Sequence, residues 1–152
     1  MSFIALIDYG MGNLMSVSKA LEYVGGKIRV VDTPSDAEGA SGVILPGVGN
    51  FGDGMEHLNR SGFVPFIRET VRRNVPFLGI CLGMQMLLES SEEAPGVPGL
   101  SIFRGRVLRF PGLGEKIPQI GWNSIRFDQD NPFLKGLRQD SFFYFVHSYY
   151  SL

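Results

Sequence analysis

Short, mostly apolar runs alternate with helical patterns from residue 3 to residue 90, and this alternation constrains the fold more than any other feature of the sequence. The apolar runs lie at residues 3–7, 27–31, 42–45 and 75–80. Runs of this length without strict polar alternation are typical of strands buried on both faces. Helical patterns follow them at residues 14–24, 55–60, 64–74 and 82–90. We therefore expect an α/β fold with three layers, a mostly parallel sheet carrying helices on both faces.

The first helical pattern has recognisable ends. Asn13 stands where a side chain can cap the first turn, and Gly25 and Gly26 stand where a helix commonly stops. Between them, one apolar stripe is formed by Leu14, Val17, Leu21 and Val24. A helix over residues 14–24 with one face against the sheet is the expectation.

The pattern changes after residue 90. Residues 90–99 are rich in turn formers, and residues 105–110, 121–127 and 141–146 resemble strands joined by short turns. Residues 131–137 suggest a single helical turn. No internal repeat or boundary divides the sequence, so we expect residues 1–152 to form a single domain.

Composition excludes several classes of protein. A hydrophobic content of 44% with a formal net charge of -1 indicates a globular chain and offers no basic stripe for nucleic acid. The single cysteine rules out an internal disulfide, and the N-terminal residues lack the positive start of a signal peptide. Glycine, proline and charged residues interrupt every candidate membrane span. The expectation is a cytoplasmic protein that binds neither membrane nor nucleic acid.

Cys81 stands in the segment Gly79-Ile80-Cys81-Leu82-Gly83, where a predicted strand meets a predicted helix. A G-x-C-x-G segment at such a junction is the sulfur counterpart of the nucleophile elbow of serine hydrolases. Small residues on both sides let the backbone turn sharply, and unpaired amides at a helix start can stabilise a thiolate. A lone cysteine in an apolar run is more often a small buried hydrophobe. The two glycines favour a nucleophile here.

Five segments together resemble one family. GICLGMQ (79–85) is similar to the G-x-C-x-G-x-Q elbow of the class I glutamine amidotransferases, a cysteine-dependent family with a flavodoxin-like α/β core. The segments DYGMGNLMSV (8–17), LPGVGNFGDGM (45–55), PQIGWN (118–123) and YFVHSYY (144–150) resemble the glutaminase subunits of imidazole glycerol phosphate synthases within it. The resemblance covers essentially the whole chain and implies one glutamine amidotransferase type 1 domain.

The resemblance also implies roles for individual residues. Cys81 would attack the side-chain amide carbon of glutamine, and the backbone amides of Val48 and Leu82 would bind the oxyanion. Polar groups of the substrate would be held by Gly49, Gln85, Ser148 and Tyr149. Ammonia would pass to a cyclase subunit that makes imidazole glycerol phosphate in histidine biosynthesis. That partner would form a heterodimer through a surface carrying Asn13 and Trp122. No metal or organic cofactor is implied.

The sequence departs from the family in one respect. The catalytic base of the family is a histidine followed two residues later by a glutamate, after the segment that matches 144–150, and this sequence contains neither. The residues alone would select His147 as the base, because Cys–His pairs are common in nucleophilic catalysis, but the family has a noncatalytic histidine at that position. His57 follows Asp53 by one helical turn, which suggests a surface pair. We therefore expect a domain that lacks its C-terminal segment and a chain that turns glutamine over poorly.

Two other functions fit part of the sequence. A catalytically silent binding subunit is consistent with the absent histidine and glutamate. A dinucleotide-binding oxidoreductase is consistent with Gly10, Gly12 and an acidic residue, Asp32, twenty positions later. Met15, however, occupies the place of the third glycine in that fingerprint.

Overall fold

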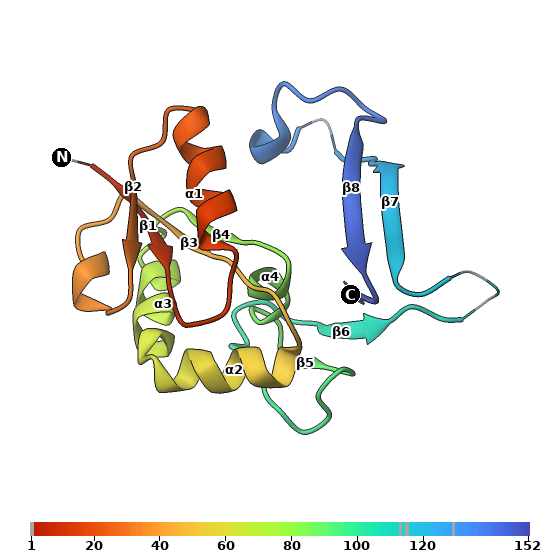
Figure 1. Cartoon of the computed structure of the whole chain (residues 1–152), viewed down its shortest axis with the longest axis horizontal. Coiled ribbons are helices and arrows are strands. Elements are labelled where there is room, and N and C mark those ends of the chain that lie inside the picture. The colour runs from red at the N-terminus through yellow and green to blue at the C-terminus, as the bar shows by residue number, and fades with distance from the viewer. Residues whose placement is uncertain (1, 113, 115, 129) are drawn as a thin grey trace. The chain divides into compact units, whose positions relative to one another are not determined.

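A computed structural model describes residues 2–112, 114, 116–128 and 130–152. The chain forms two compact units (Figure 1). The first unit extends to Leu108 and also takes in Ser151–Leu152, and the second unit is Arg109–Tyr150. Each unit is described by itself below.

The first unit is built on a four-stranded parallel sheet. Its strands are β1 (Ile4–Ile7), β2 (Ile28–Val31), β3 (Gly42–Leu45) and β4 (Phe77–Gly79), in the spatial order β2-β1-β3-β4. In β1, Ile4 pairs with Ile28 on one side and with Gly42 on the other. The central strands β1 and β3 are buried, which explains their uninterrupted apolar sequence. The predicted α/β class with a mostly parallel sheet is confirmed.

Three α-helices and one 3-10 turn connect these strands, and a fourth α-helix follows β4. They are α1 (Leu14–Tyr23), η1 (Ser35–Ala37), α2 (Phe51–Arg60), α3 (Phe63–Arg72) and α4 (Leu82–Gln85). The Asn13 side chain accepts a hydrogen bond from the Ser16 amide at 3.1 Å, which confirms the predicted cap of α1. None of the helices in the described ranges has the length and apolar composition that a bilayer crossing requires.

Two predicted helices have different limits in the structure. The helix predicted over 55–60 begins earlier, at Phe51, because the Asn50 side chain caps the Asp53 amide at 2.9 Å. The helix predicted over 82–90 ends at Gln85, since the following carbonyls bind a distant segment. The carbonyls of residues 86–89 accept hydrogen bonds from the amides of residues 99–103. Long-range pairing therefore replaces residues 86–90 of that predicted helix.

The predicted apolar stripe of α1 is only partly buried. Leu14, Val17 and Leu21 are half-buried, and no residue of α1 is fully buried. Val24, predicted as the last member of the stripe, follows the helix and is 76% exposed. The core of this unit comes instead from the sheet, α2, α3 and α4, with Phe51, Phe63 and Leu45 fully buried.

The chain then forms short strands and a hairpin. They are β5 (Ser90–Ser91), β6 (Arg106–Arg109), β7 (Gln119–Ser124), β8 (Phe142–His147) and β9 (Tyr149–Ser151), with a 3-10 turn, η2 (Pro132–Leu134), between β7 and β8. Ser90 pairs with Arg106 in parallel, and Arg106 exchanges two backbone hydrogen bonds with Leu152.

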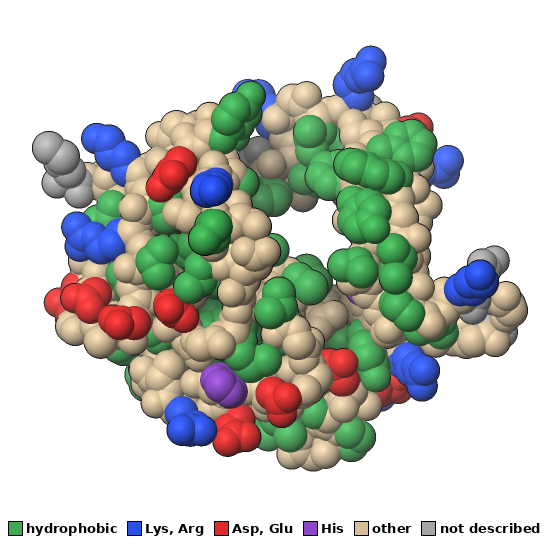
Figure 2. Space-filling view, viewed as in Figure 1, with side chains coloured by type: hydrophobic (Ala, Val, Ile, Leu, Met, Phe, Trp, Pro, Cys, Tyr) green, Lys and Arg blue, Asp and Glu red, His purple; other side chains and the backbone are tan. Residues whose placement is uncertain are grey.

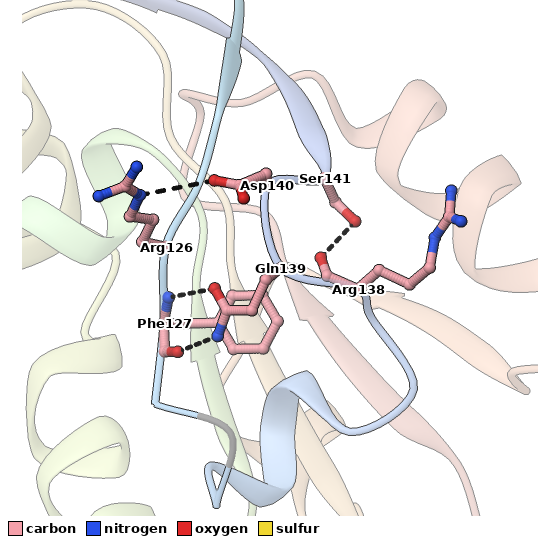
Figure 3. A network of polar contacts seen from close by, with 6 residues as sticks. All are labelled: Arg126, Phe127, Arg138, Gln139, Asp140 and Ser141. Atoms are coloured by element: carbon pink, nitrogen blue, oxygen red, sulfur yellow. Dashed lines mark hydrogen bonds and ion pairs between the residues drawn. The ribbon is translucent and has the colours of Figure 1, made fainter.

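The second unit is dominated by the antiparallel pair β7–β8. The pairing runs from Gln119 opposite His147 to Ser124 opposite Phe142. Beyond Ser124 the Ile125 amide bonds the Ser141 carbonyl, and the Ile125 carbonyl accepts from the Asp140 amide. The Gln139 side-chain amide then bonds both the amide and the carbonyl of Phe127 (Figure 3). Beside this contact, Arg126 and Asp140 form a largely exposed ion pair. The Arg126 Nε lies 3.5 Å from the Asp140 Oδ1.

Candidate functional site

Cys81 lies at the sharp junction between β4 and α4. Its backbone has φ 55° and ψ -118°, one of four described non-glycine residues with positive φ. This region of backbone space is strained for residues with a side chain and is typical of functional turns. The thiol is free and its side chain is exposed. The conformation is the one that the predicted elbow requires.

The glycines on either side of Cys81 are required by close packing. A Cβ on Gly83 would stand 1.9 Å from the carbonyl oxygen of Leu45, and one on Gly79 would stand 2.6 Å from the Met84 Cα. Both distances are far inside van der Waals contact, so no side chain fits at either position. The predicted reason for the glycines is confirmed: the backbone passes too close to β3 and α4 for a Cβ.

The loop between β3 and α2, residues 46–50, packs directly on this elbow. A Cβ on Gly47 would stand 2.6 Å from the Gly83 amide nitrogen and 2.8 Å from the Leu82 Cβ. The two segments meet because β3 and β4 are parallel neighbours, so their carboxyl ends lie at the same edge of the sheet. The structure therefore brings the Val48 loop and the Leu82 end of the elbow together.

The two amides proposed for the oxyanion are available. Throughout the described ranges, the Val48 and Leu82 amides have no hydrogen-bond acceptor, whereas the amides of Gly83, Met84 and Gln85 bond carbonyls of residues 80 and 81. Helix α4 is a single turn, shorter than expected, so its macrodipole is small. The local free amides, rather than a long helix, are the groups that can stabilise negative charge here.

The other predicted substrate residues are spread over both units. Gly49, with φ +100°, is exposed in the loop, and Gln85 is half-buried one turn after Cys81. Ser148 and Tyr149 belong to the second unit, where the Ser148 carbonyl accepts a hydrogen bond from the Phe110 amide at 3.0 Å. The roles of these four residues in binding glutamine stay predictions.

His147 is fully engaged within the second unit. Its Nδ1 lies 2.9 Å from the Tyr149 carbonyl oxygen and its Nε2 lies 2.9 Å from Gln119 Oε1. The Tyr149 carbonyl can only accept, so Nδ1 donates this hydrogen bond. Neither ring nitrogen is free to take a proton from a substrate. This geometry supports the sequence-based decision against His147 as the base.

His57 does not form the pair that the sequence suggested. No ion pair joins His57 to Asp53 in the described ranges, because the Asp53 carboxylate accepts a hydrogen bond from the Asn50 side chain instead. The His57 ring lies against Gly10, where Nδ1 would be 3.1 Å from a Cβ on that glycine.

The residues proposed for a partner surface are exposed. Asn13 is the cap of α1, and Trp122 on β7 is 66% exposed and contacts Tyr144 edge to face with ring centroids 5.6 Å apart. Hydrophobic side chains gather on the surface over β7 and β8 (Figure 2). No group of three or more metal-binding side chains occurs in the part of the chain that the structure describes.

Two contacts near the elbow were not predicted from the sequence. The Glu93 carboxylate accepts a hydrogen bond from the Phe51 amide at 2.8 Å and so fixes the start of α2 next to the β3–α2 loop. The Tyr9 hydroxyl lies beneath Gly47, 2.9 Å from the position of a Cβ on that glycine. No local spacing signals the Glu93 contact, because its partner is 42 residues away. Tyr9 could have been found from its place at the end of β1.

The chain is similar to known proteins along almost its full length. The family model described as glutamine amidotransferase class-I matches residues 5–151. The imidazole glycerol phosphate synthase subunit HisH of Moorella thermoacetica is 51% identical over 97% of this chain and 70% of that protein. The subunit HisH of Geobacillus kaustophilus is also 51% identical, over 97% of this chain and 72% of its own length.

Solved structures with lower identity share the fold. A crystal structure of a glutamine amidotransferase superposes with a TM-score of 0.70 at 19% identity, over 93% of this chain and 70% of that one. A putative GMP synthase subunit from Thermoplasma acidophilum superposes with a TM-score of 0.66 at 21% identity, over 100% of this chain and 67% of that one.

Proposed function

Because this chain belongs to the class I glutamine amidotransferase family, we propose that it is the glutaminase subunit of an imidazole glycerol phosphate synthase. It serves histidine biosynthesis by supplying ammonia from glutamine. The observation that carries the chemistry is the strained Cys81 elbow packed against a loop whose Val48 amide is free.

The proposed reaction has two halves that share one nucleophile. The Cys81 thiolate attacks the side-chain amide carbon of glutamine, and the carbonyl oxygen becomes a tetrahedral oxyanion. The carbon–nitrogen bond then breaks, nitrogen takes a proton, and ammonia leaves behind a glutamyl thioester. Water attacks the thioester through a second oxyanion, which releases glutamate and the thiol.

The amides of Val48 and Leu82 are the proposed oxyanion donors. Both are free in the structure, and their segments are in direct contact through Gly47 and the Leu82 side chain. Removing one such donor typically costs about 10² to 10³ in rate. Gly49, Gln85, Ser148 and Tyr149 are the groups proposed to hold the polar ends of glutamine.

Proton transfer is the step for which neither histidine, as the structure describes it, is placed as a free base. Both nitrogens of His147 are engaged, and His57 lies against Gly10. A positioned histidine typically contributes about 10² to 10⁴ in rate to such a step. We therefore expect this chain to form a thioester slowly and to turn over poorly. A catalytically silent, glutamine-binding subunit is the second candidate, and the engagement of His147 favours it.

The proposed partner is the cyclase subunit, in a heterodimer that receives the ammonia. Asn13 and the exposed Trp122 are the residues proposed for that interface. No cofactor is needed for the two half-reactions, and we place the complex in the cytoplasm.

Covalent labelling tests the nucleophile directly. A chloromethyl ketone analogue of glutamine is expected to label the chain once, at Cys81, far faster than it labels free cysteine, as measured by intact mass. Cys81→Ser is the matched control because the chain has a single cysteine, and it is expected to remain unlabelled. Labelling at the rate of free cysteine would contradict the proposed function.

A further inference from the structure

A cavity of about 340 Å³ is lined by α3 and by residues 37–40, which end η1 and lead toward β3. Its lining also includes Val43, near the start of β3, and Val75, two residues before β4 begins. The cavity is therefore at the edge of the sheet formed by the amino ends of these parallel strands, whereas the Cys81 elbow follows the carboxyl end of β4. Its volume is near the lower limit for ligand sites, which indicates a small molecule.

The lining is mostly apolar and contains one buried hydroxyl. Ala37 and Val43 are buried, and Phe66 is half-buried. Thr70, one helical turn after Phe66, is only 5% exposed, and its hydroxyl has no hydrogen-bond partner in the described part of the chain. Tyr9 holds the one fully enclosed side-chain oxygen without a partner there, so the Thr70 oxygen is accessible from the cavity that it lines. Most polar groups this deeply buried are paired, so a ligand is expected to supply a partner.

Two charged side chains of the lining are unpaired. The Glu69 carboxylate, which also lines the cavity, is bound through both oxygens by Arg72, at 2.7 Å each. Arg73 and Glu38, in contrast, form neither an ion pair nor a side-chain hydrogen bond within the described ranges. The cavity thus offers one positive and one negative group to a ligand.

The positive group and the hydroxyl can act on the same ligand atoms. Thr70 and Arg73 are three residues apart at the end of α3, so their side chains are neighbours on one face of the helix. A hydroxyl and a guanidinium in this arrangement can both donate to one carboxylate. The helix end opposes this little, because the carbonyls of residues 69–71 accept hydrogen bonds from the amides of residues 73–75.

We propose that this cavity binds a free α-amino acid with an apolar side chain. The carboxylate of the ligand accepts hydrogen bonds from Arg73 and Thr70, and its ammonium group donates to Glu38. Its side chain contacts Val43 and Phe66. A zwitterion matches the two opposite unpaired charges, and an amino acid is small enough for the cavity. The reactive elbow contributes no residue to this site, so the inference does not depend on the proposed function.

L-Leucine and two analogues test the charge pairing on the unmodified chain. 4-Methylpentanoate lacks the ammonium group of leucine, and 3-methylbutylamine lacks its carboxylate. In the ¹⁵N-labelled chain, leucine is expected to shift the amide resonances of Gly39 and Arg73 with a Kd of about 1 mM, because the charged groups are exposed. Each analogue is expected to bind about fivefold more weakly or less, since it loses one charged contact.

Variants assign the two ends of the ligand. Arg73→Gln is expected to weaken leucine binding about fivefold, and Thr70→Val, which keeps the branched shape of the side chain, about two- to tenfold. Glu38→Gln should weaken the binding of leucine and leave that of 4-methylpentanoate unchanged. Arg68→Gln is the matched control, because Arg68 is an exposed arginine of the same helix outside the lining.

Several outcomes would overturn the site. Equal affinities for leucine and both analogues would exclude recognition of a zwitterion, and no resonance shift at about 10 mM leucine would exclude binding. Shifts confined to the amides around Cys81 and Gly49 would place leucine at the elbow instead. Equal losses in Arg68→Gln and Arg73→Gln would reduce the effect to net charge. If Thr70→Val does not fold, the three ligands on the unmodified chain still decide.

Discussion

β3 in the first unit and β8 in the second are both strongly apolar, yet only one of them is buried. Every residue of β3 is buried, whereas β8 has four exposed and two half-buried residues. β3 has parallel neighbours on both sides, and β8 pairs with β7 alone. All hydrophobic residues in the described core lie between Ala5 and Val107. Apolar composition thus predicts a strand, but the number of layers and neighbours decides its burial.

The largest contrast is expected between two phenylalanines. Phe51→Ala, in the core of the first unit, should lower the free energy of unfolding by about 3–5 kcal/mol, because it leaves a cavity. Phe142→Ala on β8, where the side chain is 66% exposed, should cost less than about 1 kcal/mol. Urea denaturation measures both. Equal losses would show that the hairpin carries a core of its own.

A second difference concerns polar anchoring of the hairpin. His147→Ala should reduce the protection of β7 and β8 amides by about 1–2 kcal/mol in native-state hydrogen exchange, since two hydrogen bonds are lost. The amides of β1 and β3 should be unaffected. Loss of protection in β1 would mean that His147 supports both units.

Alkaline pH should act on the first unit through Tyr9. Its pKa is raised in the folded state, so above the ordinary value of about 10 the unfolded chain loses a proton that the folded chain keeps. Stability should therefore fall by about 1.4 kcal/mol per pH unit from this group as pH rises above 10. Tyr9→Phe should lack this slope, and Tyr23→Phe should retain it. Urea midpoints of the unmodified chain and the two variants, measured from pH 9 to 11, test this expectation.

The smallest expected losses of stability concern two side-chain contacts beyond the paired residues of β7 and β8. Gln139→Ala should cost about 1 kcal/mol, because it leaves the Phe127 backbone without its partner (Figure 3). Arg126→Ala should cost at most about 0.5 kcal/mol, because its ion pair with Asp140 is exposed. Hydrogen exchange of the β7 and β8 amides compares them, and a larger loss in Arg126→Ala would reverse the assignment.

Local patterns predicted most of the first unit. The apolar run 42–45 matches β3 at both ends, and Asn13 marks the start of α1, because caps and buried strands depend on neighbouring residues. The helix predicted over 82–90 begins where expected but ends at Gln85, since the carbonyls of residues 86–89 bind residues 99–103. Pairing between distant segments leaves no periodic signal in either one.

The candidate site was predictable in part for a similar reason. The glycines around Cys81 indicate a turn, and parallel neighbours bring the β3–α2 loop to it. The contacts of Glu93 and Tyr9 depend on side chains that reach across the fold, which spacing along the chain does not encode.

The positive φ of Cys81 means that the residue carrying the reactive thiol also destabilises the folded chain. Holding a residue with a side chain in such a conformation costs of order 1–3 kcal/mol, and glycine would adopt it at little cost. A library of variants selected only for thermal stability should therefore become enriched in glycine at position 81. Its most stable variants would lack the thiol.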